Sequence, residues 1–476
     1  MPRLSRRSFL AASAAFAAGR AAAAKDTAKV DVVIVGAGAA GIAAARRIAA
    51  AGRKFVVIEA ADHIGGRCIT DLRTFGIPYD RGAHWIHTPD INPVTKQPRP
   101  RRFDVYPAPA SQKVRIGRRY AREGELEDFL ALQVRANRAI ADTARKADVS
   151  CELALPNDLG DWRPAIEFML GPFGCGKDLA QVSAVDFAKS AERNADAFCR
   201  QGFGSLLAAL ADSIPVGLST PATAIDIYRG VAVKTPKGTI TARTAIVTAS
   251  TNVIAAGGIK FDPELTERQS NAFAQLSLGS YDHIALEIAG NALGLDSDDL
   301  VFEKATDTHT AAILANASNT PLCLIEVAGP FGRDLSAKGE AAMVDFAADW
   351  LAGLYGADVK KAIKRSHATR WNSEKFTLGA FSAAAPGHQG ARRLLMEPLH
   401  DTVWFAGEAA HETLWGTVGG AWDSGERAAA AVLRKLSGES EPEPTEAEAA
   451  PRHRRSKRRR AVRRQFRTTP RILGNE

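Results

Sequence analysis

Cysteine is scarce in this sequence, and its few cysteines form no recognisable pattern. There are five among 476 residues: Cys68, Cys151, Cys175, Cys199 and Cys323. The number is odd, the spacing is wide and no CxxC pair occurs, which argues against a zinc site and against a fold built on disulfides. We therefore predict no metal site in this chain.

Long apolar segments are missing as well. Beyond the N-terminal region, the sequence has no stretch of about 18 uncharged apolar residues, the length that a membrane-spanning helix requires. The remaining composition is that of a globular protein, with 46% hydrophobic and 24% charged residues. A chain of this length is expected to form about two or three domains, and we expect the mature protein to be soluble.

Excess charge is absent from the body of the chain, although the net charge is +9. Residues 1–24 carry +4, residues 439–450 carry −5 and residues 451–476 carry +10, so that residues 25–438 are neutral. No basic surface for nucleic acid is therefore indicated on the folded body. Residues 437–450 are predicted to be an acidic, proline-containing linker. The tail that follows is predicted to be disordered, and either contacts anionic surfaces or has no defined partner.

The first 24 residues have the features of an export signal. Arg6 and Arg7 are adjacent, Phe9 and Leu10 follow, and the short apolar run ends in three alanines at 22–24 that offer a cleavage site. This pattern resembles a twin-arginine signal peptide. We predict export through the twin-arginine machinery to the periplasm or the exterior. The alternative is an alanine-rich disordered N-terminus.

Residues 30–60 have the pattern of a strand, a glycine-rich turn, a helix and a second strand. The apolar run 32–35 is typical of a buried parallel strand, and the turn GAGAAG at 36–41 follows it directly. An alanine-rich helix and a second strand, which ends next to Glu59, complete the unit. This order predicts one βαβ unit.

Each part of this unit suits a dinucleotide. Gly36 permits the tight turn, Gly38 lets the backbone approach a pyrophosphate, and Gly41 lets the helix pack closely on the strand. The helix N-terminus favours phosphate. Glu59 lies eighteen residues after Gly41, where an acid can accept hydrogen bonds from a ribose. The alternative is a glycine-rich turn in an unrelated α/β domain.

The residues that follow resemble a known family. EA at 59–60 together with GGR at 65–67 is similar to the FAD-binding signature of the flavin amine oxidase family. The resemblance implies FAD as cofactor and a contact of Arg67 with its pyrophosphate, for which a permanently charged, forked donor is suited. Ala380 takes the position of the cysteine that tethers FAD in monoamine oxidases, so we expect non-covalent FAD.

The resemblance recurs along most of residues 29–436. DRGAHWIH at 80–87 is similar to a segment that passes along the flavin ring in polyamine oxidases, and TPATAI at 220–225 is similar to a strand that meets the adenine. FAGE at 405–408 and TVGGA at 417–421 resemble the C-terminal FAD motif. The predicted cofactor-binding residues are Gly36, Gly38, Ala40, Gly41, Glu59, Ala60, Gly66, Arg67, Gly82, Ala83, His84, Trp85, Ala222, Glu408, Thr417 and Val418.

Motifs far apart in the sequence would bind one cofactor, so the chain must leave the FAD domain and return to it. We predict an α/β fold in which a Rossmann-like FAD-binding domain with a parallel sheet is interleaved with an α+β substrate-binding domain of the amine oxidase type. The FAD domain is predicted to comprise residues 25–90, 203–272 and 395–436, and the substrate domain residues 100–202 and 273–394. Apolar spacing predicts helices over 125–147 and 339–365.

By the resemblance, the candidate catalytic residues are His87, His283 and Phe381. His87 follows Trp-Ile, as in spermine-type oxidases, and a neutral imidazole could bind the substrate nitrogen or relay a proton; the alternative is a histidine bonded to loop backbone. His283 stands where many members carry a lysine that is water-bridged to the flavin, and either holds that water or is a packed histidine. Phe381 replaces an aromatic beside the substrate or is ordinary core. Thr417 replaces the second aromatic, with Trp415 as a candidate substitute.

The resemblance implies oxidation of an amine, and the segment 85–87 favours a polyamine-like substrate. A hydride leaves the carbon beside nitrogen for flavin N5, the imine hydrolyses to aldehyde and amine, and oxygen, giving hydrogen peroxide, or another acceptor reoxidises the flavin. Two alternatives stay open. One is an L-amino-acid oxidase on the same fold, with Arg370 among the candidate carboxylate ligands. The other is a catalytically weak flavin-bound interaction protein that acts through its basic tail.

Overall fold

The computed structural model describes residues 30–98, 103–109, 112–190 and 195–439. The predicted signal peptide at 1–24, the basic tail at 451–476 and most of the acidic linker lie outside these residues. Contacts divide the chain into a unit of residues 1–433 and a C-terminal unit of residues 434–476. The sheets and the candidate site lie in the first unit. Within the described residues, no helix is both long enough and apolar enough to span a membrane.

An eight-stranded sheet is built from the beginning, the middle and the end of the chain. Its order is β10 (Val216–Gly217), β2 (Phe55–Ile58), β1 (Val30–Val35), β13 (Gly238–Val247), β12 (Val231–Thr235), β11 (Ala224–Ile227) and β14 (Lys260–Asp262), and β20 (Val403–Phe405) also pairs with β13. Strand β1 runs parallel to β2 and β13, and β13 runs parallel to β20. Val35, Val247 and Phe405, each the last residue of its strand, therefore end at one edge of the sheet.

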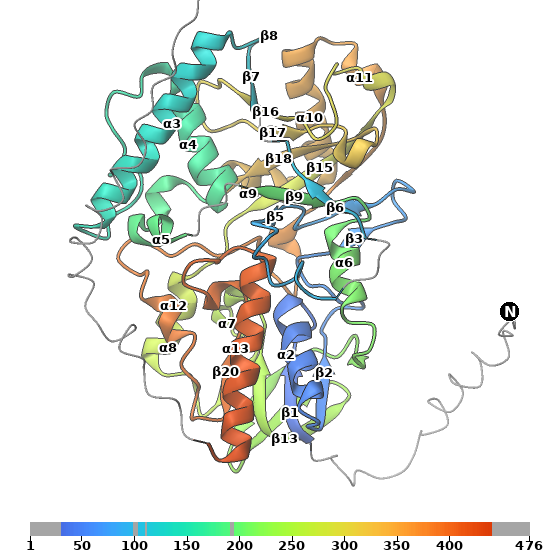
Figure 1. The fold of residues 1–476 in the computed structure, drawn as a ribbon, viewed down its shortest axis with the longest axis vertical. Helices are drawn as coiled ribbons and strands as arrows, with labels where there is room; N and C mark the ends of the chain where they lie inside the picture. Colours follow the sequence, from blue (N-terminus) through green and yellow to red (C-terminus); the bar gives the residue numbers. More distant parts are fainter. Residues whose placement is uncertain (1–29, 99–102, 110–111, 191–194, 440–476) are drawn as a thin grey trace, which may run out of the picture. The chain divides into compact units, whose positions relative to one another are not determined.

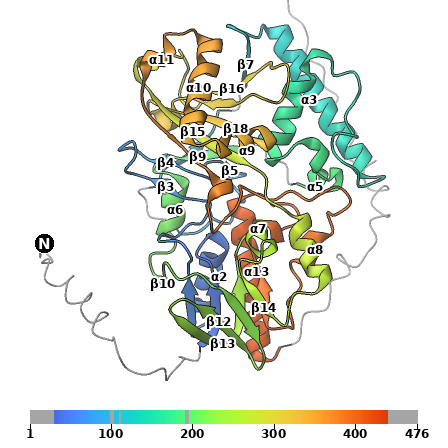
Figure 2. The same cartoon turned by 180° about the vertical axis from the view of Figure 1, so that it is seen from behind.

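Helices cover both faces of this sheet. On one face lie α2 (Ala39–Ala50) and α13 (Val418–Ser437) (Figure 1). These two helices touch through backbone, because a Cβ on Gly425 would lie 2.1 Å from the carbonyl oxygen of Ala40. Toward the opposite face lie α7 (Thr251–Ala255) and α8 (Glu267–Gln275) (Figure 2). Helix α12 (Ala391–Leu394) packs against α8.

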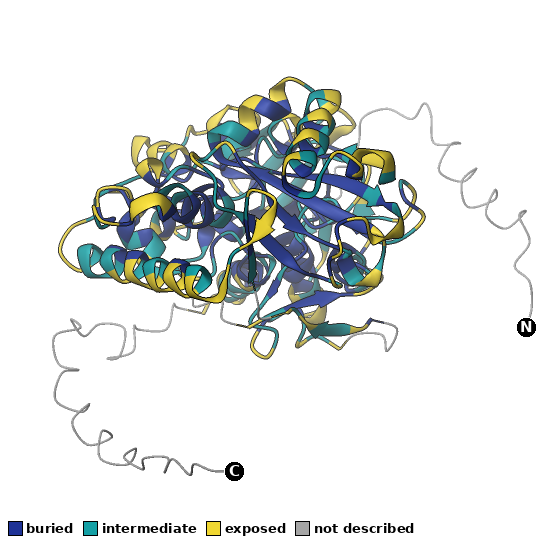
Figure 3. Cartoon of the chain, turned by 90° about the horizontal axis from the view of Figure 1, so that it is seen from above, coloured by how far each residue is buried: buried dark blue, intermediate teal, exposed yellow. Residues whose placement is uncertain are grey.

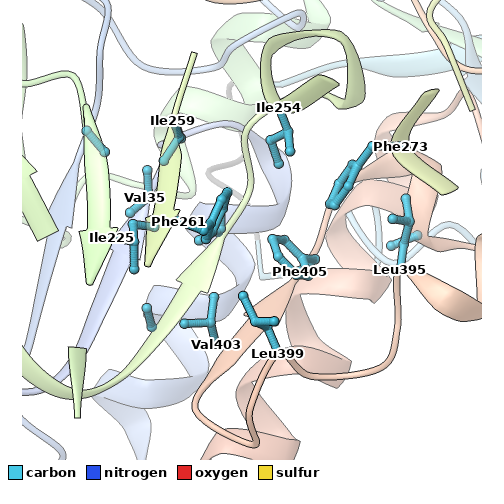
Figure 4. Close-up of a cluster of buried hydrophobic side chains, with 14 of the residues drawn as sticks. Val35, Ile225, Ile254, Ile259, Phe261, Phe273, Leu395, Leu399, Val403 and Phe405 are labelled. Atoms are coloured by element: carbon cyan, nitrogen blue, oxygen red, sulfur yellow. The ribbon is translucent and has the colours of Figure 1, made fainter. Parts of the chain in front are cut away.

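The core under α7, α8 and α12 is apolar and well packed (Figure 4). The ring of Phe405 on β20 packs edge-on against Phe261 at 5.9 Å and Phe273 at 5.1 Å between ring centroids. Val35, Ile225 and Leu395 are buried in the same cluster. This packing fixes β20, the last strand to join, against strands that lie more than a hundred residues earlier in the chain.

The second large sheet is mixed and mostly antiparallel. Its order is β19 (Ile363–Ala368), β15 (Tyr281–Ile288), β18 (Leu322–Ala328), β17 (Ala312–Leu314), β16 (Leu300–Glu303), β7 (Gln112–Ile116) and β8 (Arg119–Tyr120). The helices in this part of the chain are α3 (Glu123–Ala144), α4 (Arg163–Phe168), α5 (Ala184–Lys189), α9 (Gly329–Ala337), α10 (Glu340–Tyr355) and α11 (Val359–Ala362). Seen from above, buried strands are enclosed by helices and loops whose outer faces are exposed (Figure 3).

Two small sheets connect the large ones. Strands β3 (Thr70–Asp71) and β4 (Tyr79–Asp80) pair with each other, and β9 (Asp196–Cys199) lies between β5 (Ile86–His87) and β6 (Val105–Pro107). Helix α6 (Phe203–Ala209) follows β9.

Of the two helices predicted from apolar spacing, one is confirmed and one is interrupted. The helix predicted over 125–147 is confirmed as α3. The helix predicted over 339–365 is wrong as one continuous element, because α10 ends at Tyr355, the short helix α11 covers Val359–Ala362 and a strand begins at Ile363. Gly356 follows α10 with φ of 100°, a conformation in the left-handed region that ends a helix and that glycine adopts without a steric penalty.

Candidate active site

The glycine-rich turn between β1 and α2 closes on backbone atoms alone. Gly36 has φ of 104°, and a Cβ on Gly41 would lie 1.9 Å from the carbonyl oxygen of Gly36. Gly38 faces Gly65 and Gly66, whose nearest atoms lie 3.8 and 3.9 Å from the position of its missing Cβ. Three glycines thus form a cradle without side chains at the N-terminus of α2, where backbone N–H groups favour phosphate.

Glu59 lies beside this cradle, at the end of β2. Its side chain is buried and accepts hydrogen bonds from the backbone N–H groups of Ala37 (2.7 Å) and Ala61 (2.9 Å). Two other predicted residues lie close by. Ala60 directly follows Glu59 in the sequence, and Ala40 is buried in the first turn of α2. The predicted ribose ligand is therefore held next to the predicted phosphate cradle.

Arg67 and Glu408 meet although they are 341 positions apart. Arg67 Nη1 donates to Glu408 Oε1 at 2.9 Å and to the carbonyl oxygen of Ala380 at 2.7 Å. Burial alone would raise the pKa of Glu408, but Arg67, the Ser382 hydroxyl and Arg392 outweigh burial and hold this pKa below its usual range. Glu408 is therefore ionised at neutral pH, at the place where the first and last predicted FAD motifs touch.

A cleft opens at the carboxyl ends of β13 and β20. Its lining includes Arg67, Thr248, Ser250, Phe405, Gly407 and Glu408. Ligands of sheets with parallel strands bind outside the carboxyl ends of those strands. The cleft thus lies at the edge of the sheet where β1 leads into the glycine cradle.

A buried ion pair is linked to Glu408 through the hydroxyl of Ser382. Arg392 on α12 donates to both carboxylate oxygens of Asp186 on α5, at 2.6 and 2.7 Å, and both side chains are fully buried. Arg392 also donates to the hydroxyl of Ser382 at 3.1 Å, and that hydroxyl donates to Glu408 at 2.7 Å. The orientation of Glu408 is therefore fixed through Ser382 and Arg392, neither of which was among the predicted site residues.

The segment 82–85 passes directly beside Arg67. A Cβ on Gly82 would lie 2.1 Å from the Arg67 carbonyl oxygen, and the backbone N–H of Ala83 donates to the same oxygen at 3.0 Å. His84 is buried, with Nδ1 2.9 Å from Asp80 Oδ2, and its Nε2 makes no hydrogen bond to any described residue. Trp85 keeps part of its surface exposed.

His283 and Phe381 share one neighbour, Tyr281. The Tyr281 ring centroid lies 5.8 Å from that of His283 and 5.8 Å from that of Phe381. His283 Nδ1 is 3.1 Å from the carbonyl oxygen of Asp80, which identifies Nδ1 as the donor. Burial lowers the pKa of His283 to about 4, so the imidazole is neutral. Tyr281 was predicted to be a packing residue rather than a chemical one, but its place two residues before His283 on a strand puts both side chains on one face.

His87 lies on β5, in a different sheet from His283. Its Nδ1 is 2.7 Å from Asp196 Oδ1 on β9, and both side chains are partly exposed. The structure thus gives His87 a carboxylate partner that sequence analysis did not identify. The two are 109 positions apart, and no local pattern connects them.

The remaining predicted residues lie at helix and strand ends. Thr417 is buried, and its hydroxyl donates to the Leu414 carbonyl (2.7 Å) and accepts from the Gly420 N–H (2.9 Å), at the start of α13. Val418 is the first residue of that helix. Ala222 is buried just before β11. The guanidinium of Arg392 lies over the Trp415 ring, and the ring centroid of Tyr281 lies 5.8 Å from that of Phe381.

Comparison with known proteins decides the family. The model of the family described as flavin containing amine oxidoreductase matches residues 39–433. The chain belongs to this family. Membership confirms FAD as the predicted cofactor. The side-chain-free cradle, the adjoining Glu59 and the charged pair Arg67–Glu408 at the cleft fit the phosphates and hydroxyl groups of that cofactor.

Two relatives of this flavin-containing amine oxidoreductase have different named activities. Lysine-specific histone demethylase 2 of Homo sapiens is 25% identical over 463 residues, which cover 86% of this chain and 54% of the demethylase. Polyamine oxidase 4 of Oryza sativa subsp. japonica is 24% identical over 443 residues, which cover 85% of this chain and 89% of the oxidase. The chain thus spans about half the length of the demethylase and most of the length of the polyamine oxidase.

Solved structures of two amine oxidases share the fold of this chain. Cyclohexylamine oxidase from Brevibacterium oxydans IH-35A aligns with a TM-score of 0.71 at 20% identity, over 86% of this chain and 100% of that one. Putrescine oxidase bound to putrescine aligns with a TM-score of 0.70 at 19% identity and the same coverage. The predicted fold, a Rossmann-like domain with an α+β partner, is confirmed.

Proposed function

We propose that this protein oxidises a polyamine-like amine with non-covalently bound FAD. The observation that carries the proposal is the meeting of Arg67 with Glu408 beside the glycine cradle, at a cleft on the carboxyl edge of the sheet. When bound, FAD accepts the hydride from the carbon next to nitrogen. The resulting imine hydrolyses to an aldehyde and an amine, and oxygen, giving hydrogen peroxide, or another acceptor takes the electrons.

The protein's own residues position the reactants in this proposal. Arg67 provides a fixed positive charge toward the pyrophosphate, and Glu59 and Glu408 provide acceptors for hydroxyl groups. Neutral His283 and the rings of Tyr281 and Phe381 form a mostly apolar wall where the amine is held. An apolar wall favours the neutral amine, whose lone pair supports the developing imine.

A polyamine-like substrate is favoured by the partly exposed pair His87–Asp196. A carboxylate with an adjacent imidazole suits the ammonium group of a long cation. The named activity of the polyamine oxidase relative points the same way. An L-amino acid would require an arginine beside the substrate for its carboxylate, and Arg370, one candidate for that role, directs its Nε–H to the carbonyl oxygen of Ser336 at 3.0 Å.

A substrate screen tests this proposal. We expect spermidine to bleach the flavin absorbance of the holoprotein without oxygen, faster than tyramine and far faster than leucine. Readmitted oxygen is then expected to restore the colour with formation of hydrogen peroxide. Faster bleaching by leucine would replace the proposal with an amino-acid oxidase, and bleaching without peroxide would indicate a dehydrogenase. No bleaching by any of the three would end the proposal of amine oxidation.

We further propose that the protein is exported by the twin-arginine machinery. This rests on the arginine pair and the short apolar run within residues 1–24, which lie outside the described residues. Fusion of this segment to a reporter, with Arg6 and Arg7 both replaced by lysine as control, tests it. Equal export of both fusions would contradict it. For the tail at 451–476, we propose contact with anionic surfaces through its basic residues.

A further inference from the structure

A carboxylate is buried beside His283. Glu326 lies on β18, directly across from His283 on β15, and its side chain is fully buried. Within the described part of the chain, neither of its carboxylate oxygens has a well-formed hydrogen bond, and its nearest donors are the Tyr281 hydroxyl and the Trp85 indole. His283 Nε2 lies 3.7 Å from Glu326 Oε1, too far for a hydrogen bond. Burial of a charge without a well-formed hydrogen bond costs folding free energy, so we expect Glu326 to have a function.

The surroundings of Glu326 are aromatic and carry few charges. The Tyr281 hydroxyl and the Trp85 indole face it from two elements, and His84 also acts on it. The strand on its other side presents Ala312. Burial raises the pKa of Glu326 to about 7, and Tyr281, His84 and Trp85 oppose the rise without cancelling it. Both histidines are near, yet His283 is neutral and His84 binds Asp80.

Partly exposed aromatic side chains adjoin this position, because Trp85 and Tyr281 act on Glu326 and Phe381 packs beside Tyr281. Trp85, Tyr281 and Phe381 all keep part of their surface accessible, while Glu326, His283 and His84 behind them are buried. Phe173, also partly exposed, continues the wall at 5.9 Å from Tyr281. Aromatic faces around an anionic end are the chemistry that receives an ammonium group.

We propose that Glu326 receives the ammonium group of the substrate amine and takes one proton from it before hydride transfer. This inference rests on the proposed function, since it assigns a further catalytic residue to the same site. An N–H bond of the ammonium breaks, its electron pair stays on nitrogen, and an O–H bond forms on the carboxylate. No oxidant is required. Hydride loss from the neutral amine leaves an iminium ion, which water converts to the aldehyde and an ammonium product without this proton. The carboxyl therefore releases its proton to water when the products leave.

Burial itself drives this proton transfer. An ammonium and a carboxylate in a dry site are both deprived of water, and the desolvation penalty applies to each charge. Moving one proton from nitrogen to oxygen turns two buried charges into two neutral groups. The neutral amine is the form that can donate its lone pair to the developing imine.

Flavin reduction by the variant Glu326→Gln tests the inference. We expect the rate constant of anaerobic reduction by spermidine at pH 7 to fall by about 100-fold or more, which is typical for loss of a general base. The deficit should shrink steadily toward pH 10, because neutral amine then enters from solution. The matched control is Glu303→Gln on β16, whose carboxylate already accepts from Thr310 and Trp350 at 2.7 Å each. This control should keep the wild-type rate.

The outcomes separate the inference from the proposed function. If spermidine, tyramine and cyclohexylamine all fail to reduce the wild-type flavin, the proposed function falls and the role of Glu326 falls with it. If the wild type is reduced but Glu326→Gln matches it at pH 7, only the role of Glu326 is refuted. A deficit of equal size at every pH would also refute it, because a purely structural role predicts that pattern.

A stability measurement gives a readout that does not depend on turnover. Folding raises the pKa of Glu326 above its ordinary 4.5 to about 7, so the folded state holds a proton that the unfolded state releases. The carboxyl therefore lowers stability progressively from about pH 4.5 to pH 7 and by a constant amount above that. The melting temperature of Glu326→Gln relative to wild type should rise across this window. A constant difference from pH 4.5 to 8 would refute the raised pKa of this buried carboxyl.

Discussion

Replacement of Asp186 by alanine is expected to lower the free energy of unfolding by about 3–5 kcal/mol. The reason is that Arg392, fully buried, would lose both of its carboxylate contacts and remain as an uncompensated charge. Asp186 Oδ2 also accepts the N–H of Ala384 at 2.9 Å, and this bond would be lost too. The measurement is urea unfolding of the purified protein followed by fluorescence.

Two controls isolate the buried charge as the cause. Arg393, the next residue along α12, pairs with Glu412 at 2.9 Å but is mostly exposed, so Glu412→Ala should change stability by less than about 1 kcal/mol. The double variant Asp186→Leu with Arg392→Met removes both charges and should be more stable than Asp186→Ala alone. If Asp186→Ala were no less stable than Glu412→Ala, the importance of the buried pair would be contradicted.

Gly41→Ala is expected to weaken FAD binding strongly. The added Cβ would lie 1.9 Å from the Gly36 carbonyl oxygen, and backbone cannot rotate away as a side chain can. The first turn of α2 must shift, and with it the N–H groups that face the pyrophosphate. Overpacking of this kind costs about 1–3 kcal/mol, which corresponds to weakening of FAD affinity by up to about 100-fold. Titration of the apoprotein with FAD, followed by flavin fluorescence, measures it.

A second glycine-to-alanine variant shows whether the effect is local. Gly353 lies within α10, and a Cβ there would meet no atom within 4 Å. Gly353→Ala should bind FAD like wild type and be slightly more stable, because alanine favours a helix by about 1 kcal/mol over glycine. An unchanged FAD affinity in Gly41→Ala would show that the cradle does not hold the cofactor.

The parts of the site that could be predicted from the sequence are those whose residues lie close together in the chain. Gly36, Gly38 and Gly41 lie within six residues, and their spacing follows from one turn and the start of one helix. The acid at the end of the second strand follows from the length of the intervening helix. Arg67 and Glu408 required family resemblance, because nothing in the chain between them indicates that they touch.

Long-range partners had no sequence signal of their own. Asp186 and Arg392 are 206 positions apart and sit in short helices of unremarkable composition. The partner of His87, Asp196, belongs to a strand of four residues. Glu326 did have a signal, since it is the one charged residue in the otherwise apolar strand LCLIEVA. A charge amid such a run is rarely buried without a function.

The misjudged helix shows why periodicity alone can mislead. Apolar spacing over 339–365 fits a helix through Tyr355, and the spacing continues beyond it. Gly356 ends the helix because its φ of 100° breaks the hydrogen-bond ladder, and the next regular strand, β19, pairs with β15. That pairing depends on residues about eighty positions earlier and cannot be read from the window itself.

The place of β20 has a consequence for synthesis of the protein. This strand, Val403–Phe405, forms the parallel neighbour of β13 and leads straight into Glu408. When the ribosome has translated β1, the glycine cradle, β2 and β13, the nascent chain still lacks one wall of the cleft. Cofactor capture must therefore wait for nearly the whole polypeptide, and a nascent chain interrupted before this strand should emerge without flavin.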